Sequence, residues 1–371
     1  MTGLILQFGT SRFLQAHVDL FLHEAREAGQ DVPSVVIVQT SGSAERAGRL
    51  AAFSDPAGFP VVLRGLEDGM ATERRVAVKS VSRGLSTASD WAEIVDLFAR
   101  EADFVVSNTG DSGYAVTPGE ASTGLFADTP LVSFPGKLLQ LLHARWQRGG
   151  RPLTVLPCEL VNRNGPALRA IVRDLAATAS APVDFLRFLD QEVVFANTLV
   201  DRIVSEPLQP AGAVAEPYAL WAIERAPGLS LPCTHPSIVL TDDLEPYERL
   251  KLHILNLGHS VLADIWLRDG RPEHETVRAI LADPTVNTRL DAIYRDEVLP
   301  GFSARGMGDA ARAYVATTMD RFRNPYLDHR IADIAGNHAL KVERRIAAFL
   351  DWAGTPAPVL SSIVSRQKAT A

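Results

Sequence analysis

The first half of the chain alternates short apolar runs with stretches of helical length, and this alternation restricts the fold more than any other feature. Residues 34–39, Ser-Val-Val-Ile-Val-Gln, are continuously apolar, which is typical of a strand buried on both faces. Repeated strand–helix units predict a parallel sheet with helices on both faces. The expected strands are residues 4–8, 34–39, 75–81, 103–107 and 153–156, and the expected helices are 12–28, 90–100, 134–147 and one opening at Asn164.

The second half is predicted to be all-helical, because strand-like runs end near Leu240. A chain of 371 residues is longer than one core usually serves, so two domains are expected. The Pro- and Gly-rich segment 225–235 is the expected hinge, which gives an α/β domain over residues 1–235 and a helical domain over 236–371. The expected helices are 245–268, 275–283, 287–297, 308–324, 327–335 and 339–353, followed after Thr355 by a loose tail or a final short helix.

The composition and charge of the chain disfavour some classes of binding partner. The net charge is −7 and no Lys/Arg cluster offsets it, which disfavours nucleic-acid binding. No run of 18 apolar residues occurs, so no membrane partner is expected. The first residues resemble a strand rather than a signal peptide, and Cys158 and Cys233 are expected to be reduced thiols, which favours the cytoplasm. We expect a monomer or small homo-oligomer that acts on a small molecule.

A leucine-rich run without proline, residues 247–266, predicts one buried helix that carries three polar side chains. At 100° per residue, Lys251, Asn256 and His259 fall within an arc of roughly 140° that they share with leucines. Burial lowers the pKa of a lysine, which suits a general base, while the asparagine and histidine suit a substrate oxygen. A structural interpretation is the alternative. In it, Lys251 extends to water, Asn256 caps a neighbouring element, and His259 is a core histidine whose hydrogen bonds are satisfied.

No zinc site is expected, because the nine histidines show no HxxxH spacing and there is no Cys-rich motif. A dinucleotide site is expected where the first strand ends, at residues 7–13. Only Gly9 of a glycine-rich fingerprint is present there, so an ordinary strand–helix turn is the alternative. The polar stretch 107–113 suits the nicotinamide half of a cofactor, or is a simple polar turn. Residues 39–43 contain no acid for a ribose and Arg46 and Arg49 follow, so NAD is expected and NADP stays open.

Together these segments resemble the polyol-specific long-chain dehydrogenase/reductase family, which includes the mannitol dehydrogenases and hexuronate reductases. The resemblance covers nearly the whole chain. Its signature is a lysine, four residues, an asparagine, two residues and a histidine, which Lys251, Asn256 and His259 match without a gap. The Gln-Phe-Gly opening and the Pro157-Cys-Glu-Leu run look most like the tagaturonate reductase (altronate oxidoreductase) branch, although Ser11 and Gln15 depart from it. Further matching segments are 13–19, 106–109, 164–165, 195–203 and 321–326.

The resemblance implies a Rossmann-type first domain and a role for each of several residues. Lys251 is the general base, Asn164 and Asn256 donate hydrogen bonds to the developing alkoxide, and His259 orients the substrate. Asp201 lies near the lysine and tunes or relays its proton; a plain partner of Arg202 is the alternative. The cofactor-binding residues are Gly9, Thr10 and Phe13 at the pyrophosphate turn, with Asn108 and Thr109 near the nicotinamide.

Lys341 resembles a basic substrate-binding position that suits a carboxylate, with a solvated helix lysine as the alternative. The expected reaction is zinc-independent hydride transfer between a keto sugar acid, such as tagaturonate or fructuronate, and its aldonate, in a cleft between the two domains. One alternative is a polyol dehydrogenase for a neutral sugar alcohol such as mannitol or arabinitol. Another is a sensor protein that kept the fold and lost turnover.

Overall fold

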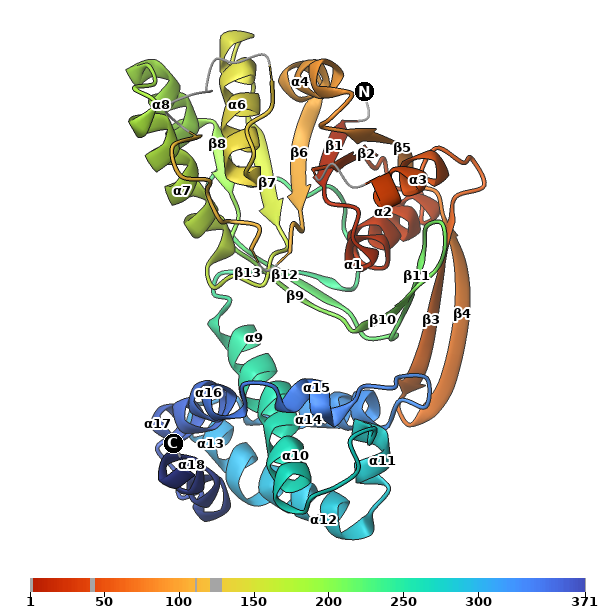
Figure 1. The fold of residues 1–371 in the computed structure, drawn as a ribbon, viewed down its shortest axis with the longest axis vertical. Helices are drawn as coiled ribbons and strands as arrows, with labels where there is room; N and C mark the ends of the chain where they lie inside the picture. The colour runs from red at the N-terminus through yellow and green to blue at the C-terminus, as the bar shows by residue number, and fades with distance from the viewer. Residues whose placement is uncertain (1–2, 41–43, 111, 121–128, 371) are drawn as a thin grey trace. The chain divides into compact units, whose positions relative to one another are not determined.

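The computed structural model describes residues 3–40, 44–110, 112–120 and 129–370 (Figure 1). The chain forms two compact units. The first comprises Met1–Val62, Arg75–Ala215 and Ala219–Leu244, and the second comprises Leu63–Arg74, Glu216–Tyr218 and Glu245–Ala371. An α/β unit and a helical unit are the fold class that the sequence predicts.

A six-stranded sheet with the order β5-β2-β1-β6-β7-β8 forms the centre of the first unit. Every neighbouring pair in it is parallel. The inner strands β1, β2, β6 and β7 are buried on both faces, as the fully buried Ile5, Leu6, Val35, Val105 and Val155 show. This burial explains the continuous apolar runs. The strands are β1 (Leu4–Phe8), β2 (Ser34–Gln39), β5 (Val81–Ser86), β6 (Ala102–Ser107), β7 (Leu153–Pro157) and β8 (Val193–Phe195).

Helices cover both faces of this sheet. Side chains of four helices share one apolar core with Leu6 and Phe8 of β1; these helices are α4 (Trp91–Arg100), α6 (Phe134–Gln147), α7 (Asn164–Thr178) and α8 (Val183–Gln191). Because successive strand residues point to opposite faces, Gln7 points the other way. There its Nε2 donates to Asp19 of α2 (Val18–Glu27) at 3.2 Å. A short helix, α3 (Ala44–Ala52), follows β2.

The expected helix over residues 12–28 is interrupted. It forms as α1 (Arg12–Gln15) and α2, with a break at Ala16 and His17. The Arg202 guanidinium donates to the Ala16 carbonyl, and the His17 ring bonds the Leu220 carbonyl at 3.1 Å. The break is therefore stabilised by hydrogen bonds to residues distant in the sequence. No local sequence pattern reveals such bonds.

Seven further strands were not expected, or were misplaced, because they are short or lie in hairpins. The predicted strand 75–81 is in fact the end of β4 and the start of β5, which belong to different sheets and are separated by residues 79 and 80. A four-stranded sheet has the order β10-β11-β3-β4, and a three-stranded sheet has the order β13-β12-β9. The strands are β3 (Phe59–Glu67), β4 (Met70–Val78), β9 (Thr198–Asp201), β10 (Val204–Pro207), β11 (Ala213–Ala215), β12 (Leu220–Glu224) and β13 (Ile238–Thr241).

The boundary between the units differs from the predicted hinge. Strand β13 pairs in parallel with β12, with Trp221 opposite Ile238. Residues 236–244 therefore stay with the first unit, and the helical unit resumes at Glu245. Two short segments that precede Glu245 in the sequence, Leu63–Arg74 and Glu216–Tyr218, also pack within the helical unit.

The second unit packs around one central helical run, α9 (Glu245–Leu250), η1 (Lys251–Asn256) and α10 (Leu257–Arg268). The surrounding helices are α11 (Val277–Leu281), α12 (Pro284–Ile293), η2 (Tyr294–Val298), α13 (Leu299–Ala304), α14 (Gly308–Arg323), α15 (Ile331–Ala335), α16 (His338–Val342), η3 (Glu343–Ala347), α17 (Ala348–Ala353) and α18 (Pro358–Thr370). The tail is thus a 13-residue helix whose Leu360 and Ile363 are buried in the core. Among the described residues, no helix is long and apolar enough to cross a membrane.

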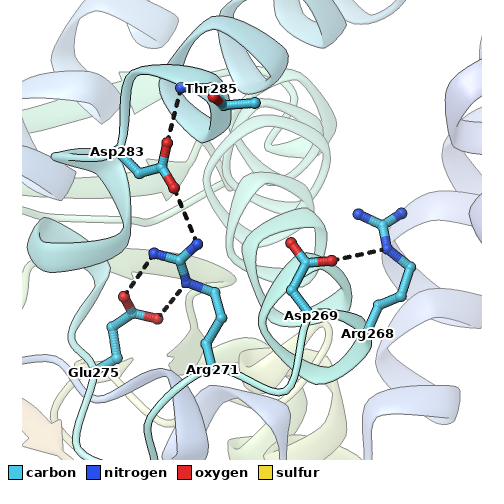
Figure 2. A network of polar contacts seen from close by, with 6 residues as sticks. All are labelled: Arg268, Asp269, Arg271, Glu275, Asp283 and Thr285. Carbon is cyan, nitrogen blue, oxygen red and sulfur yellow. Dashed lines mark hydrogen bonds and ion pairs between the residues drawn. The ribbon is translucent and has the colours of Figure 1, made fainter.

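A charged network fixes the loop that ends this central run (Figure 2). The Arg271 guanidinium donates to both oxygens of Glu275, at 2.8 and 3.0 Å, and to Asp283 at 3.1 Å. The other oxygen of Asp283 accepts the Thr285 N–H at 2.9 Å, so Asp283 caps α12. These bonds attach the end of α10 to the start of the next helices.

Candidate active site

The turn after β1 has the backbone conformation that close approach requires. Gly9 has a φ of +114°, and a Cβ placed there would lie 2.5 Å from the carbonyl oxygen of Asn108. The Asn108 N–H in turn donates to the Phe8 carbonyl at 3.0 Å. The ends of β1 and β6 therefore lie side by side, and the space between them exists only because residue 9 lacks a side chain.

The remaining residues predicted for this turn lie beside Gly9. Thr10 is buried, and its carbonyl accepts bonds from Gln15 Nε2 at 3.3 Å and from Arg49 Nη1 at 3.5 Å. Phe13 is half-buried and stacks on the His17 ring, with 4.7 Å between centroids. Arg49 thus lies at the turn itself; the side chain of Arg46 is outside the described residues.

The ends of β6 and β7 are joined through one buried carboxylate, Glu159, which the sequence analysis quoted without giving it a role. Its Oε1 accepts the N–H and the hydroxyl of Thr109, at 3.0 and 2.9 Å. Its Oε2 accepts the hydroxyls of Ser107 at 3.0 Å and Tyr114 at 3.3 Å. Burial raises the pKa of the Glu159 carboxyl, and the bonds from Thr109 and Ser107 oppose that rise. An acid two residues after a buried strand is the signal that could have identified it.

Glu159 and its neighbours hold both residues predicted to lie near the nicotinamide. Asn108 Nδ2 donates to the Cys158 carbonyl at 2.8 Å, so Asn108 and Thr109 are each bonded to the Cys158–Glu159 pair. Cys158 is a buried free thiol, and burial raises its pKa well above the usual value.

Asn164 is only 1% exposed, at the first position of α7. Its Nδ2 lies within 3.1 to 3.2 Å of the carbonyls of Pro157 and Glu159. Its Oδ1 accepts the N–H groups of Gly165 and Thr198, at 2.8 and 3.0 Å. In this conformation the amide fastens the loop after β7. For the Asn164 side-chain amide to donate to a substrate oxygen, it would have to give up its bond to the carbonyl of Pro157 or of Glu159.

Asp201, the last predicted catalytic residue of the first unit, ends β9 and is 4% exposed. Its neighbour Arg202 does not point into solvent; its guanidinium donates to Ala16 and lies over the Phe21 ring at 5.7 Å.

The geometry of the first unit suits a dinucleotide. Its strand order places β1 between β2 and β6, the switch point at which such sheets bind ligands beyond their carboxyl ends. Gly9, Asn108 and Thr109 all lie at these ends, and the missing Cβ of Gly9 leaves room for a close approach to the backbone. The four-residue α1 offers no long helix dipole, whereas the backbone of the turn and Arg49 are positioned to contact phosphates.

In the second unit the Lys251–Asn–His motif does not lie on a regular α-helix. Residues Lys251–Asn256 form a π-helical segment, and the N–H of Leu257 bonds back to the Leu252 carbonyl five residues earlier. Lys251 and Asn256 are half-buried and His259 is 6% exposed. In an α-helix residues five apart are about 140° apart, whereas a π-turn closes between residues i and i+5. The structure therefore brings Lys251 and Asn256 closer to one side than the sequence predicts.

His259 is enclosed by rings. Its ring centroid lies 4.6 Å from that of Phe322 and 5.0 Å from that of His329. Burial lowers the pKa of His329.

Lys341 is half-buried rather than fully solvated. Its Nζ donates to the Ile334 carbonyl at 2.7 Å. Burial, and then the nearby Arg345, lower the pKa of Lys341. Arg345, which the sequence analysis did not single out, donates to the Asn256 carbonyl and the Ser260 hydroxyl, each at 3.3 Å. Two cations thus lie beside the helix that carries Lys251.

A cavity of about 820 Å³ also occurs in the helical unit, between the β3–β4 hairpin and α14. A buried ion pair, Glu216–Arg321 at 2.9 Å, contributes to its wall. None of the residues predicted from the sequence to be catalytic lines it.

Comparisons with known proteins assign most of the chain to one family. The family model described as the mannitol dehydrogenase Rossmann domain matches residues 4–230, and the one described as the mannitol dehydrogenase C-terminal domain matches residues 243–355. The altronate oxidoreductase of Bacillus subtilis strain 168 is 31% identical, over 92% of this chain and 73% of that protein. The altronate oxidoreductase of Escherichia coli O1:K1 is 30% identical over the same shares.

Two solved structures share the fold. D-sorbitol dehydrogenase in substrate-free form has a TM-score of 0.76 at 18% identity, over 93% of this chain and 75% of that one. The Pseudomonas fluorescens mannitol 2-dehydrogenase complex with NAD and D-mannitol has a TM-score of 0.70 at 19% identity, over 99% and 79%. With both family domains matched in order, the chain belongs to the mannitol dehydrogenase family and is an NAD-dependent oxidoreductase that acts on a secondary alcohol.

Proposed function

We propose that this enzyme interconverts a keto sugar acid, a hexuronate such as tagaturonate or fructuronate, and its aldonate. The observation that carries the proposal is that Arg345 bonds the Asn256 carbonyl at the end of the Lys251–Asn256 π-turn, with Lys341 close to Arg345. A lysine base serves any secondary alcohol, but further cations packed against the helix that carries it favour a substrate that bears a carboxylate. The names of the curated relatives, altronate oxidoreductases at about 30% identity, agree with this class.

In the proposed mechanism Lys251 Nζ takes the proton of the substrate hydroxyl during oxidation and returns it during reduction. Asn256 Nδ2 donates to the oxygen that becomes negative, which is the stabilisation that an oxyanion site supplies. Asn164 is proposed as a second donor, in exchange for one of its carbonyl bonds. His259 orients the substrate, and Asp201 tunes the charge of the lysine or relays its proton.

NAD, when bound, supplies the hydride acceptor, and the protein supplies orientation. Gly9, Thr10 and Phe13 are proposed to hold the pyrophosphate, and Asn108 and Thr109 the nicotinamide side. NAD is proposed over NADP, although Arg49 lies at the turn. A kcat/KM that favours NADPH by more than about tenfold, or about 1.4 kcal/mol, would reverse this preference.

A substrate panel tests the proposal. Altronate and mannonate should be oxidised with a kcat/KM at least about tenfold above that for mannitol or arabinitol, because a charge-assisted bond to a cation stabilises the carboxylate. Lys341→Ala should remove most of this difference, whereas Lys368→Ala, at an exposed lysine of α18 in the same unit, should leave it intact. Equal or better turnover of neutral alditols would identify a polyol dehydrogenase instead. No NAD(H)-linked turnover with any member of the panel would favour a binding protein.

A further inference from the structure

The π-turn that carries Lys251 and Asn256 is supported from outside its own helix. Tyr294, the first residue of η2, is 2% exposed, and its hydroxyl donates to the carbonyl oxygen of Ile254 at 2.9 Å. Ile254 lies inside the π-turn, between Lys251 and Asn256. A side chain that bonds into the hydrogen-bond ladder is one of the few causes of a departure from α-helical geometry.

Gly258 gives Tyr294 access to that carbonyl. A Cβ on residue 258 would lie 2.0 Å from the Tyr294 hydroxyl oxygen and 3.0 Å from a ring carbon of Phe322. Gly258 is helical and has no positive φ in this structure, so its backbone does not require glycine. The requirement is space for the hydroxyl, and a glycine inside a helix otherwise lowers stability by roughly 1 kcal/mol relative to alanine.

The two residues depend on each other for a physical reason. The Tyr294 hydroxyl is buried, and a buried hydroxyl without a partner is unfavourable. If the segment relaxed to regular α-helix, the Ile254 carbonyl would turn relative to the helix axis and the hydroxyl would lose its acceptor. The π-turn and the Tyr294 bond therefore stabilise each other, and Gly258 permits both.

We propose that Tyr294, admitted by Gly258, is a positioning residue for the reaction: its bond to Ile254 maintains the π-turn that keeps Lys251 and Asn256 on one side. This inference rests on the proposed roles of Lys251 and Asn256. In this proposed role Tyr294 contacts neither the substrate nor the cofactor. It acts through the backbone that carries the two reacting side chains.

The first test replaces Tyr294→Phe, which removes only the hydroxyl. The expected result is a kcat lower by about ten- to a hundredfold, because a displacement of about 1 Å at reacting groups has an effect of that size. The pH midpoint of the oxidation rate should move as well, since Lys251 changes its surroundings. The NADH dissociation constant should stay within about twofold, because the proposed cofactor residues belong to the other unit.

The matched control is Tyr314→Phe. Tyr314 is also a buried tyrosine of the helical unit, and its hydroxyl accepts a bond from Arg321 at 3.3 Å. This variant should lower the melting temperature about as much as Tyr294→Phe while leaving kcat and the pH midpoint unchanged. Equal losses of kcat in both variants would show a general effect of destabilisation and would overturn the inference.

A double variant tests the pairing directly. Gly258→Ala should lower kcat more than Tyr294→Phe does, because the new methyl group collides with the hydroxyl. Gly258→Ala combined with Tyr294→Phe should be more active than the product of the two single effects, because the most severe collision, that with the hydroxyl, is gone. Multiplicative effects would show that the two residues act separately and would contradict the proposal.

Lys251→Ala separates this inference from the function itself. An inactive Lys251→Ala enzyme beside a Tyr294→Phe enzyme with wild-type kcat and pH profile would overturn the positioning role alone. A Lys251→Ala enzyme that keeps its turnover would overturn the proposed chemistry, and the positioning role with it.

Discussion

Gly9 and Asn108 approach so closely that a Cβ on residue 9 would lie 2.5 Å from the Asn108 carbonyl oxygen. The contact joins the ends of β1 and β6 at the switch point of the sheet. The partner is backbone, which has little freedom to yield, and the φ of +114° is unfavourable for any other residue. Both facts make the turn specific for glycine.

Gly9→Ala should therefore weaken NADH binding by at least about tenfold, and strain of this kind lowers stability by roughly 1–3 kcal/mol. Fluorescence titration with NADH and thermal melting measure the two effects. Gly29→Ala is the matched control, because Gly29 also has a positive φ but nothing lies within 4 Å of its Cβ position. It should lower the melting temperature and leave NADH affinity unchanged; an equal loss of affinity would argue against a local effect at the turn.

Lys251→Ala should lower kcat by about 10²–10⁴-fold, the usual contribution of a positioned proton-transfer group. NADH affinity should remain within a few-fold. Asn256→Ala should lose roughly 10²–10³-fold in kcat if its amide stabilises the alkoxide. Steady-state rates and NADH titration provide the measurements, and a Lys251→Ala enzyme with the wild-type pH profile would show that the lysine is structural.

Glu159→Ala should raise the NADH dissociation constant by about tenfold. The change removes the acceptor of the half-buried Thr109 N–H and of the buried Ser107 hydroxyl, and an unsatisfied buried group costs about 1–3 kcal/mol. Glu159→Gln should restore most of the affinity, because its carbonyl can accept from Thr109 while its amide donates to the hydroxyls of Ser107 and Tyr114.

Glu120→Ala is the control for Glu159. Glu120 is a buried carboxylate of the same unit, and it accepts the Ser133 N–H at 3.0 Å. Its removal should lower the melting temperature without changing NADH affinity. A similar loss of affinity in both variants would mean that Glu159 contributes stability only.

The raised pKa of Asp19 should make the free energy of unfolding fall as the pH rises. Burial raises the pKa of Asp19 from 3.8 to about 8, against a smaller lowering by the bond from Gln7. The folded state then holds a proton that the unfolded state has lost between about pH 4 and pH 8. The free energy of unfolding falls across that window, by an amount on the order of a few kcal/mol.

Asp19→Asn mimics the protonated acid and should flatten this dependence. The variant should melt at a higher temperature than the wild type at pH 8 and at a similar temperature at pH 5. Melting curves across this pH range measure the effect. A parallel fall in both proteins would assign the dependence to another group.

Turnover should be independent of a metal, because a lysine base takes the role that a metal-bound hydroxide or Lewis acid has in other alcohol dehydrogenases. Exhaustive treatment with a chelator, followed by gel filtration, should leave kcat unchanged. Loss of the rate and its recovery on addition of zinc would contradict the proposed chemistry.

The sequence predicted the parallel sheet because its buried strands are continuous apolar runs, as at Val35–Val38, and such a pattern survives in any tertiary context. It also predicted the Lys251, Asn256 and His259 set from residue types and spacing. It did not predict the break at His17 or strand β13, because each depends on partners distant in the chain. It gave Glu159 no role, although its place just after a buried strand was a usable signal, because its four hydrogen-bond donors come together only in the folded sheet.

The amino-acid sequence by itself thus determined which residues line the ends of the strands and which polar residues share the central helix. Only the tertiary structure decided the backbone geometry that orients those residues. The leucine-rich run around Lys251 is compatible with a regular α-helix, and nothing local favours a π-turn. The π-turn forms where the Tyr294 hydroxyl, 40 residues later, bonds Ile254 over the space left by Gly258. A backbone geometry that depends on a distant hydrogen bond is not encoded in local periodicity, because the bond exists only once both helices have packed.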